Sequence, residues 1–215
     1  MNDSRDNYLK AIYDEGEDII VSNKILAEKL QVAPSSVSEM LSKLSSKGLI
    51  EIIPYKGCKL TNEGVDACID IVRIHRLWEV FLIEYLGYNW REAHEDAHIL
   101  EHAGTPRMVE RLNKFLNYPK TCPHGSRIPQ MNHELTNKSV LTKLSDLKTG
   151  SIGILTKIEE DGTLLDYLWS LGLKVGKDIK VLSKGIYEGP ITILQDDMEY
   201  YVTYKAATQI YITMK

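Results

Sequence analysis

Residues 22–60 read SNKILAEKLQVAPSSVSEMLSKLSSKGLIEIIPYKGCKL, and this stretch decides how the N-terminal part of the chain folds. Apolar residues recur at helical spacing on both sides of Ala33-Pro34, and Ser22 stands at a favoured helix start. Two strand-like runs, 49–53 and 58–61, flank the turn 54–57. Two short helices followed by a hairpin predict a winged helix-turn-helix, whose second helix enters the major groove of DNA.

The second helix of this unit and the hairpin tip carry polar side chains that can reach base edges and phosphates. The segment is locally basic, since residues 22–60 hold six lysines and three glutamates. A helical hairpin used only for packing, with serines as ordinary caps, is the alternative interpretation. The residues expected to contact DNA are Ser35, Ser36, Ser38, Glu39, Lys43 and Lys56.

The composition excludes several classes of protein. The 215 residues carry a net charge of −4, so a basic coat for nucleic acid is excluded and DNA binding needs a local patch. The acidic N-terminus lacks the apolar run of a secretory signal, and no stretch approaches the about 18 apolar residues of a membrane span. Three cysteines are too few for a disulfide framework. We expect a cytoplasmic protein without a membrane partner.

The spacing of apolar residues divides the remaining chain into a helical part and a part rich in short strands. Prolines and polar residues between them indicate a linker, and the strand-like runs after it suggest a small β-barrel with one helix, 164–171. The fold class is therefore mainly α with a small β domain. The predicted domains are 1–64 (winged helix), 65–130 (helical), 131–143 (linker) and 144–215 (β-barrel).

Histidines and carboxylates are concentrated in two helical windows. His94, His98, Glu101 and His102 are spaced i, i+4, i+7 and i+8, which places them on one face of a helix. His75 and Glu79 form an i, i+4 pair on the preceding helix. Imidazoles with carboxylates suit Mn(II), Fe(II), Zn(II), Co(II) or Ni(II) better than Mg(II) or Ca(II). A solvated face with His–Glu pairs is the alternative.

The stretch His94-Glu95-Asp96-Ala97-His98 also matches the H-E-x-x-H motif of zinc hydrolases, in which two histidines bind zinc and the glutamate activates water. A zinc-dependent hydrolase and a metal buffer protein are therefore alternative functions. The winged helix beside the motif favours DNA binding over both, and we expect no enzyme.

Taken together, the chain resembles the diphtheria-toxin-repressor and manganese-transport-regulator family of metal-dependent transcriptional repressors. The resemblance rests on the opening 7–13, the recognition helix 33–40, His75-Arg76-Leu77-Trp78-Glu79, and Glu101-His102. The segment Thr121-Cys122-Pro123-His124-Gly125 and the β-rich tail are similar to the three-domain manganese-sensing subgroup of Gram-positive bacteria. The resemblance covers the chain end to end and implies a C-terminal barrel of the Src-homology-3-like (FeoA-like) type.

The resemblance implies a primary metal site made of Asn7, His98, Glu101 and His102. Manganese sensors of the family usually carry Asp and Glu where this chain has Asn7 and His98, although Asp6 lies beside Asn7. An imidazole in place of a carboxylate favours Zn(II) or Fe(II) over Mn(II). The family nevertheless puts Mn(II) first, with Fe(II) or Zn(II) as alternatives.

The resemblance also implies a second site, in one of two versions. One version uses His75, Glu79 and His94 with an acidic residue from the C-terminal domain. The other uses Glu79, Cys122 and His124 with an acid among Glu159, Glu160 and Asp161, of which Glu160 is our choice. A half-buried inert cysteine is the alternative for Cys122.

The family pattern further implies that 65–130 is the dimerisation and metal-binding domain of a homodimer, which represses metal-uptake and homeostasis genes. Two winged helices then need a separation of about 34–36 Å to enter successive major grooves of the operator. Divalent metal is expected to select the domain orientation that binds double-stranded operator DNA.

Overall fold

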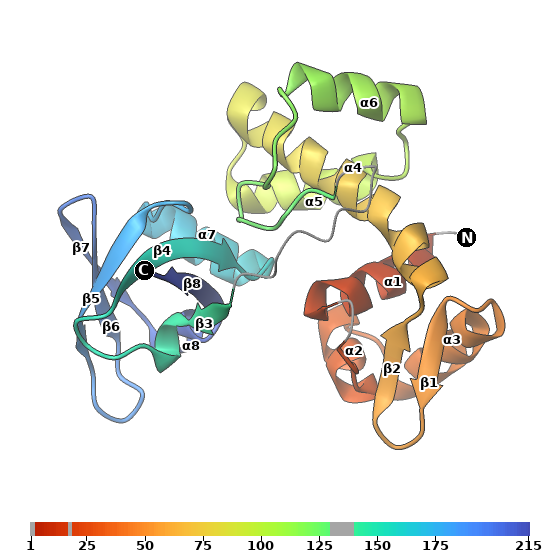
Figure 1. The fold of residues 1–215 in the computed structure, drawn as a ribbon, viewed down its shortest axis with the longest axis horizontal. Coiled ribbons are helices and arrows are strands. Elements are labelled where there is room, and N and C mark those ends of the chain that lie inside the picture. Colours follow the sequence, from red (N-terminus) through yellow and green to blue (C-terminus); the bar gives the residue numbers. More distant parts are fainter. Residues whose placement is uncertain (1–2, 17–18, 130–139) are drawn as a thin grey trace. The chain divides into compact units, whose positions relative to one another are not determined.

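The computed structural model describes residues 3–16, 19–129 and 140–215 (Figure 1). The chain forms two compact units, residues 1–74 and 75–215, and the boundary falls inside the long helix α4 (Asn62–Leu86). Most of the predicted linker lies outside the described residues, but Leu141–Lys143 at its end form a strand. Among the described helices, none is long and apolar enough to cross a membrane.

The first unit is the predicted winged helix-turn-helix. Ser22 caps its second helix by accepting a hydrogen bond from the Ile25 amide, and Pro34 opens its third, where a missing amide hydrogen costs nothing. The two strands of the wing pair antiparallel, with Ile50 opposite Leu60. The elements are α1 (Asp3–Glu15), α2 (Asn23–Leu30), α3 (Pro34–Ser46), β1 (Ile50–Ile53) and β2 (Gly57–Leu60), followed by α4.

A single apolar cluster holds the first unit together. The inward faces of the three helices and of the wing supply it, and Leu9, Ile12, Leu26 and Leu44 are fully buried there. Val21 also forms a bridge to Cys58, which ties the segment before α2 to the wing. This packing leaves the opposite face of α3 exposed.

The second unit begins with the C-terminal part of α4. Two further helices follow, α5 (Trp90–Leu100) and α6 (Pro106–Phe115). Asn89 caps α5 in a capping box with Glu92, and Thr105 caps α6. These caps fix where each helix begins, and so fix which side chains of α5 face α4.

The rest of the second unit is a six-stranded antiparallel sheet with the strand order β3-β8-β4-β5-β6-β7. The helix α7 packs its apolar face on the sheet, and Trp90 from α5 joins the same core. The elements are β3 (Leu141–Lys143), the 3-10 turn η1 (Leu144–Asp146), β4 (Ile152–Ile158), α7 (Gly162–Leu171), β5 (Asp178–Lys184), β6 (Ile191–Gln195), β7 (Met198–Val202), α8 (Tyr204–Ala207) and β8 (Ile210–Met214).

The structure corrects three details of the predicted β domain. Helix 164–171 is not alone there, because η1 and the short helix α8 are also present. Residues 200–204 read as a strand in the sequence, but the strand ends at Val202, since Thr203 caps α8 by accepting a hydrogen bond from the Ala206 amide. The strands β3 and β8 were missed, although Ile210–Met214 is rich in β-branched and aromatic residues.

Candidate metal centres and DNA interface

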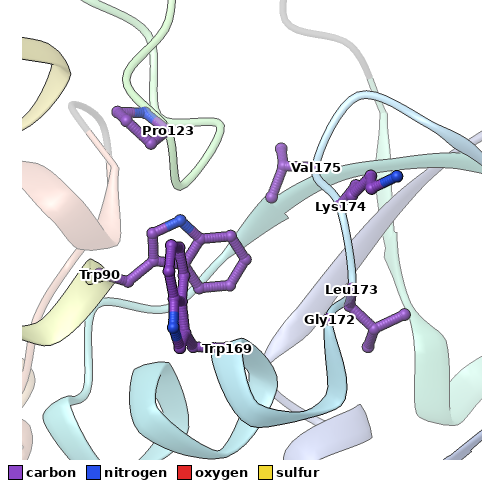
Figure 2. Close-up of a pocket in the computed structure, with 7 residues that line it drawn as sticks. All are labelled: Trp90, Pro123, Trp169, Gly172, Leu173, Lys174 and Val175. Atoms are coloured by element: carbon purple, nitrogen blue, oxygen red, sulfur yellow. The ribbon is translucent and has the colours of Figure 1, made fainter. Parts of the chain in front are cut away.

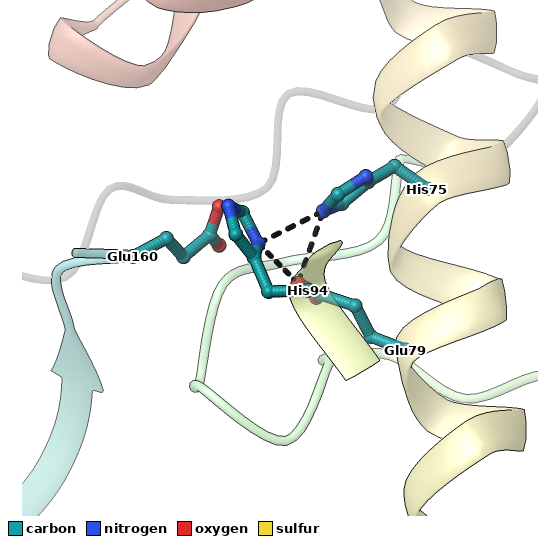
Figure 3. Close-up of side chains that lie close together, drawn as sticks. All are labelled: His75, Glu79, His94 and Glu160. Atoms are coloured by element: carbon teal, nitrogen blue, oxygen red, sulfur yellow. Dashed lines mark hydrogen bonds and ion pairs between the residues drawn. The ribbon is translucent and has the colours of Figure 1, made fainter. Parts of the chain in front are cut away.

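The carboxylate of Glu79 is the centre of a buried group of metal-ligand side chains (Figure 3). Its Oε1 lies 3.0 Å from His75 Nε2, 2.9 Å from His94 Nδ1 and 3.3 Å from His124 Nδ1. Its Oε2 is buried and has no hydrogen-bond partner among the described residues. A buried oxygen without a partner is costly unless a ligand satisfies it.

Three elements of the second unit, together with the loop 121–127, bring these side chains together. His75 and Glu79 are one turn apart on α4, so they share a face. His94 stands on α5, one turn after the capping box. Glu160 follows the end of β4, and its Oε1 accepts a hydrogen bond from Ser126 Oγ at 3.0 Å. Figure 3 shows Glu160 reaching His94 from the side opposite α4.

The loop 121–127 supplies Cys122 and His124 and is fixed on both sides. The Ile158 amide of β4 donates to the His124 carbonyl at 3.0 Å, and Arg76 of α4 donates to the Arg127 carbonyl at 2.5 Å. Gly125 makes this possible, because its φ is +84° and a Cβ there would lie 1.8 Å from the Thr156 carbonyl oxygen. Only glycine fits a backbone that approaches β4 so closely.

The charges in this group are strongly coupled. Burial disfavours a charged Glu79, but His124 and His75 outweigh it and hold the pKa of Glu79 well below its usual range. Burial likewise opposes a charged His124, yet Glu79 raises the pKa of that imidazole well above its usual range. Burial raises the pKa of the Cys122 thiol. Without metal the group therefore contains a buried carboxylate–imidazolium pair.

Glu160 keeps its charge in the same surroundings. Burial and the nearby Glu79 oppose ionisation, but Arg76, His124 and His94 lower the pKa of Glu160 to about 2. Asp161, one of the two alternative acids, instead caps α7 by accepting from the Leu164 amide. Among the three acids of this segment, Glu160 lies in the donor group, and that it binds metal stays a prediction.

A second buried carboxylate, Glu101, is the centre of another group. Its Oε2 lies 2.6 Å from His75 Nδ1, and its Oε1 lies 3.4 Å from His98 Nδ1 and 3.6 Å from His102 Nε2. Helix α5 ends at Leu100, so Glu101 is its C-cap and His102 follows in a turn rather than on the helix. His75, His98 and Glu101 place their ligand atoms within 4.8 Å of one another.

His75 therefore belongs to both groups, which the sequence did not reveal. One ring nitrogen meets Glu79 and the other meets Glu101. The i, i+4 spacing of His75 and Glu79 is visible in the sequence, whereas the contact with Glu101 joins α4 to the end of α5 across 26 positions of the chain.

These residues fit a divalent transition metal. Each of the three groups found in the described residues has three or four ligand atoms within 4.8 Å, and both the Glu79 carboxylate and the His124 ring keep a buried atom without a partner. Imidazole, carboxylate and thiolate together suit Mn(II), Fe(II) or Zn(II), whereas Mg(II) and Ca(II) favour oxygens alone.

The hydrolase interpretation is not supported by the same geometry. Glu95, which would be the general base of a zinc hydrolase, is exposed, and its Oε1 accepts a hydrogen bond from Arg91 Nε at 2.8 Å. Glu95 belongs to none of the donor groups, and His94 and His98 fall into different ones.

Two predicted ligand positions lie in the first unit. Asn7 is exposed on α1, whereas its neighbour Asp6 is buried and forms an ion pair with Arg5 at 2.7 Å. That Asn7 completes the primary site stays a prediction.

The residues expected to contact DNA are all exposed in the first unit. Five of them lie on α3, and Lys56 lies in the turn of the wing. Glu39 Oε1 and Lys43 Nζ form an ion pair at 2.6 Å. Contact with DNA remains a prediction for these residues, and the structure leaves this face of α3 free of packing within its unit.

A separate apolar pocket of about 350 Å³ lies beside the loop 121–127 (Figure 2). Its walls include Trp90, Trp169 and Pro123, and the two indole rings meet edge to face at 5.6 Å. None of its lining residues belongs to a donor group. Trp90 also packs against the His124 ring at a centroid distance of 5.9 Å, so the pocket wall helps to hold that side chain.

Comparison with known proteins gives three family matches along the chain. Residues 1–58 match the iron dependent repressor N-terminal DNA binding domain. Residues 61–130 match the iron dependent repressor metal binding and dimerisation domain, and residues 142–214 match the FeoA domain.

Individual relatives agree with these matches. The iron-dependent repressor IdeR of Mycobacterium leprae (strain TN) is 31% identical over 156 residues, which are 69% of this chain and 68% of that protein. A structure of a manganese-dependent transcriptional repressor in complex with manganese is 31% identical, covers 98% of this chain and 100% of its own, and has a TM-score of 0.86. The structure of the manganese regulator SloR is 39% identical, with 98% of each chain covered and a TM-score of 0.80.

Proposed function

Because the chain belongs to the diphtheria-toxin-repressor family of metal-dependent transcriptional repressors, we propose that it represses metal-ion uptake and homeostasis genes in response to the metal bound by its own donor groups. The observation that carries the proposal is the pair of buried carboxylates, Glu79 and Glu101, each surrounded by imidazoles and joined through His75. A chain that needed only packing at this place would bury apolar side chains at lower cost.

The second site combines both of the versions considered from the sequence. His75 and His94 approach Glu79 from one group, and Cys122 and His124 approach it from the other, while Glu160 is common to both. A bound divalent ion would satisfy Glu79 Oε2 and hold together α4, α5, the loop 121–127 and the end of β4. The protein side chains supply nitrogen, oxygen and sulfur donors that select a transition metal.

Mn(II) is the regulating metal in this proposal, because two structural relatives are named as manganese-dependent regulators. His98 argues against Mn(II), because an imidazole beside Glu101 favours Fe(II) or Zn(II). Asn7 would complete the Glu101 group as the fourth ligand, together with His98 and His102.

The proposed repressor is a homodimer. Phe81 and Tyr85 of α4 contact Phe115 of α6 at ring-centroid distances of 6.1 and 4.9 Å, yet Tyr85 and Phe115 are 51% and 57% exposed. Large exposed aromatic side chains that lie together mark an interaction surface. The match of residues 61–130 to a dimerisation domain supports a second copy of this chain as the partner.

The test uses duplexes that the Mn(II)-loaded protein selects from a randomised pool. Metal-free protein is titrated against such a duplex by fluorescence anisotropy while Mn(II), Fe(II) and Zn(II) are added in turn. We expect tight binding only with metal, and loss of the metal response in Glu79→Gln and Glu101→Gln. The matched control is Glu95→Gln, whose exposed carboxylate lies on the same helix as His94.

Two outcomes would contradict the proposal. One is DNA binding that is equally tight with metal and with a chelator. The other is a parent-like metal response in both Glu79→Gln and Glu101→Gln.

A further inference from the structure

The exposed face of α3 consists mainly of serines and one glutamate. Ser35, Ser38, Glu39 and Ser42 are spaced i, i+3, i+4 and i+7, so they share one face, and all four are exposed. The opposite face is buried through Val37, Leu41 and Leu44. In a winged helix-turn-helix the exposed face of this helix meets the major groove.

Two of the serine hydroxyls on this face, those of Ser38 and Ser42, use their hydrogens within the helix. Ser38 Oγ donates to the Pro34 carbonyl at 3.1 Å, and Ser42 Oγ donates to the Ser38 carbonyl at 3.0 Å. A hydroxyl has one hydrogen, so Ser38 and Ser42 have no second hydrogen to donate to a base. Ser38 Oγ also accepts a hydrogen bond from Asn23 Nδ2 of α2 at 3.2 Å. The small size of these serines lets the helix approach base edges closely and leaves longer side chains to distinguish the bases.

Glu39 and Lys43 are the longer polar side chains of this surface. Glu39 Oε1 lies 2.6 Å from Lys43 Nζ, and the two side chains are 70% and 60% exposed. The hydrogen bond and the charge of Lys43 lower the pKa of Glu39, so its carboxylate is ionised at neutral pH. The pair presents a carboxylate acceptor and an ammonium donor side by side.

A carboxylate on a DNA-binding face is unfavourable near phosphates unless it meets a hydrogen-bond donor. In the major groove the donors are cytosine N4 and adenine N6. In a C·G pair, the cytosine N4 donor lies beside the O6 and N7 acceptors of guanine, which match an ammonium group. In an A·T pair, adenine N6 lies between the acceptors N7 and O4, which repel a carboxylate.

We propose that Glu39 and Lys43 together read a C·G base pair in each half-site, with Glu39 accepting from cytosine N4 and Lys43 donating to guanine. This inference rests on the proposed binding of operator DNA through α3. It makes Glu39 a residue that sets base preference, at some cost in affinity for DNA in general.

The test compares base preference rather than affinity alone. Full-length, metal-loaded parent, Glu39→Gln and Lys43→Met are each used to select duplexes from a randomised pool. The preferred bases are then checked by anisotropy on duplexes that differ at one base pair. The matched control is Glu28→Gln on α2, which removes an exposed carboxylate at the same i, i+4 spacing from Lys24.

We expect the parent to require a C·G pair at one position of each half-site, with about tenfold weaker binding when it is replaced. Glu39→Gln loses this preference and binds random DNA more tightly, because a negative charge has gone. Lys43→Met loses the guanine preference and affinity, and Glu28→Gln keeps the parental preference.

Two results would overturn the inference. One is a Glu39→Gln protein that selects the same base as the parent at every position, and the other is a change confined to an A·T position. A parent that selects no sequence at all would instead contradict the proposed DNA binding, so the two failures are distinguishable.

Discussion

Replacing Gly125 by alanine is expected to displace the loop that carries Cys122 and His124. A Cβ at this position would lie 1.8 Å from the Thr156 carbonyl oxygen, and real Cβ atoms essentially never approach within 3.0 Å. The loop or β4 therefore has to move by more than 1 Å. The positive φ of +84° remains unfavourable for alanine even after that movement.

The substitution should lower both the free energy of unfolding and the metal affinity, and the two losses are measured separately. A left-handed backbone costs an alanine about 1–2 kcal/mol, and crowding in a packed region costs about 1–3 kcal/mol. The free energy of unfolding should therefore fall by roughly 2–5 kcal/mol. Ligand distances in a metal site tolerate only about 0.2 Å, so metal affinity at the Glu79 group should fall by about 10- to 100-fold or more.

A Co(II) titration measures the loss of metal affinity directly, through the absorption of the thiolate–metal bond. The band reports on Cys122, because Cys122 lies among other donor side chains, whereas Cys58 and Cys68 pack in the apolar core of the first unit. The control is Gly150→Ala, which has a φ of +88° and nothing within 4 Å of its Cβ position. It should lose only about 1–2 kcal/mol of stability and bind Co(II) like the parent. Parental Co(II) affinity in Gly125→Ala would refute the argument.

Three further predictions concern DNA contacts, ligands and pH. Lys56→Ala should weaken operator binding and flatten its salt dependence by about one unit, with unchanged metal affinity; an unchanged slope in a salt series would argue against a phosphate contact. His98→Ala should abolish metal-activated DNA binding, whereas His94→Ala should reduce it only in part. Anisotropy at saturating metal distinguishes the two variants, and a metal response like that of the parent in His98→Ala would show that the Glu101 group is not the primary site. Metal binding should release the proton of His124, since the pKa of His124 is raised in the metal-free protein. The apparent affinity should therefore rise with pH until that raised pKa is passed, and calorimetry in two buffers of different ionisation enthalpy should show the proton.

The elements that sequence alone could predict are those set by local rules. Ser22 is predicted as a helix start, and the structure confirms that it caps α2. Asn89 and Thr105 cap α5 and α6 by the same local rule. The spacing of His75 and Glu79, and of His94 and His98, also follows from helical periodicity. These local signals placed the winged helix and most of the candidate ligands.

What the sequence could not show depends on contacts between distant segments. Gly125 matters because β4 lies against it, some 30 positions further along the chain. The role of Asp161 could be predicted more easily from the sequence, because Asp161 precedes a helix start and can cap that helix. This leaves Glu159 and Glu160 as the candidate acids. The strand β8 belongs instead to the features that follow local rules, because Ile210–Met214 has strong β propensity.

The role of His75 links the two donor groups in a way that neither would show alone. A neutral imidazole that binds a metal through one nitrogen keeps its proton on the other. If His75 binds metal through Nε2 beside Glu79, its Nδ1–H is left to donate to Glu101, 2.6 Å away. Such a carboxylate orients the ring and raises its basicity as a ligand. Each carboxylate is thus a candidate ligand in its own group and a supporting partner in the other, so a substitution at Glu101 should also weaken metal binding beside Glu79.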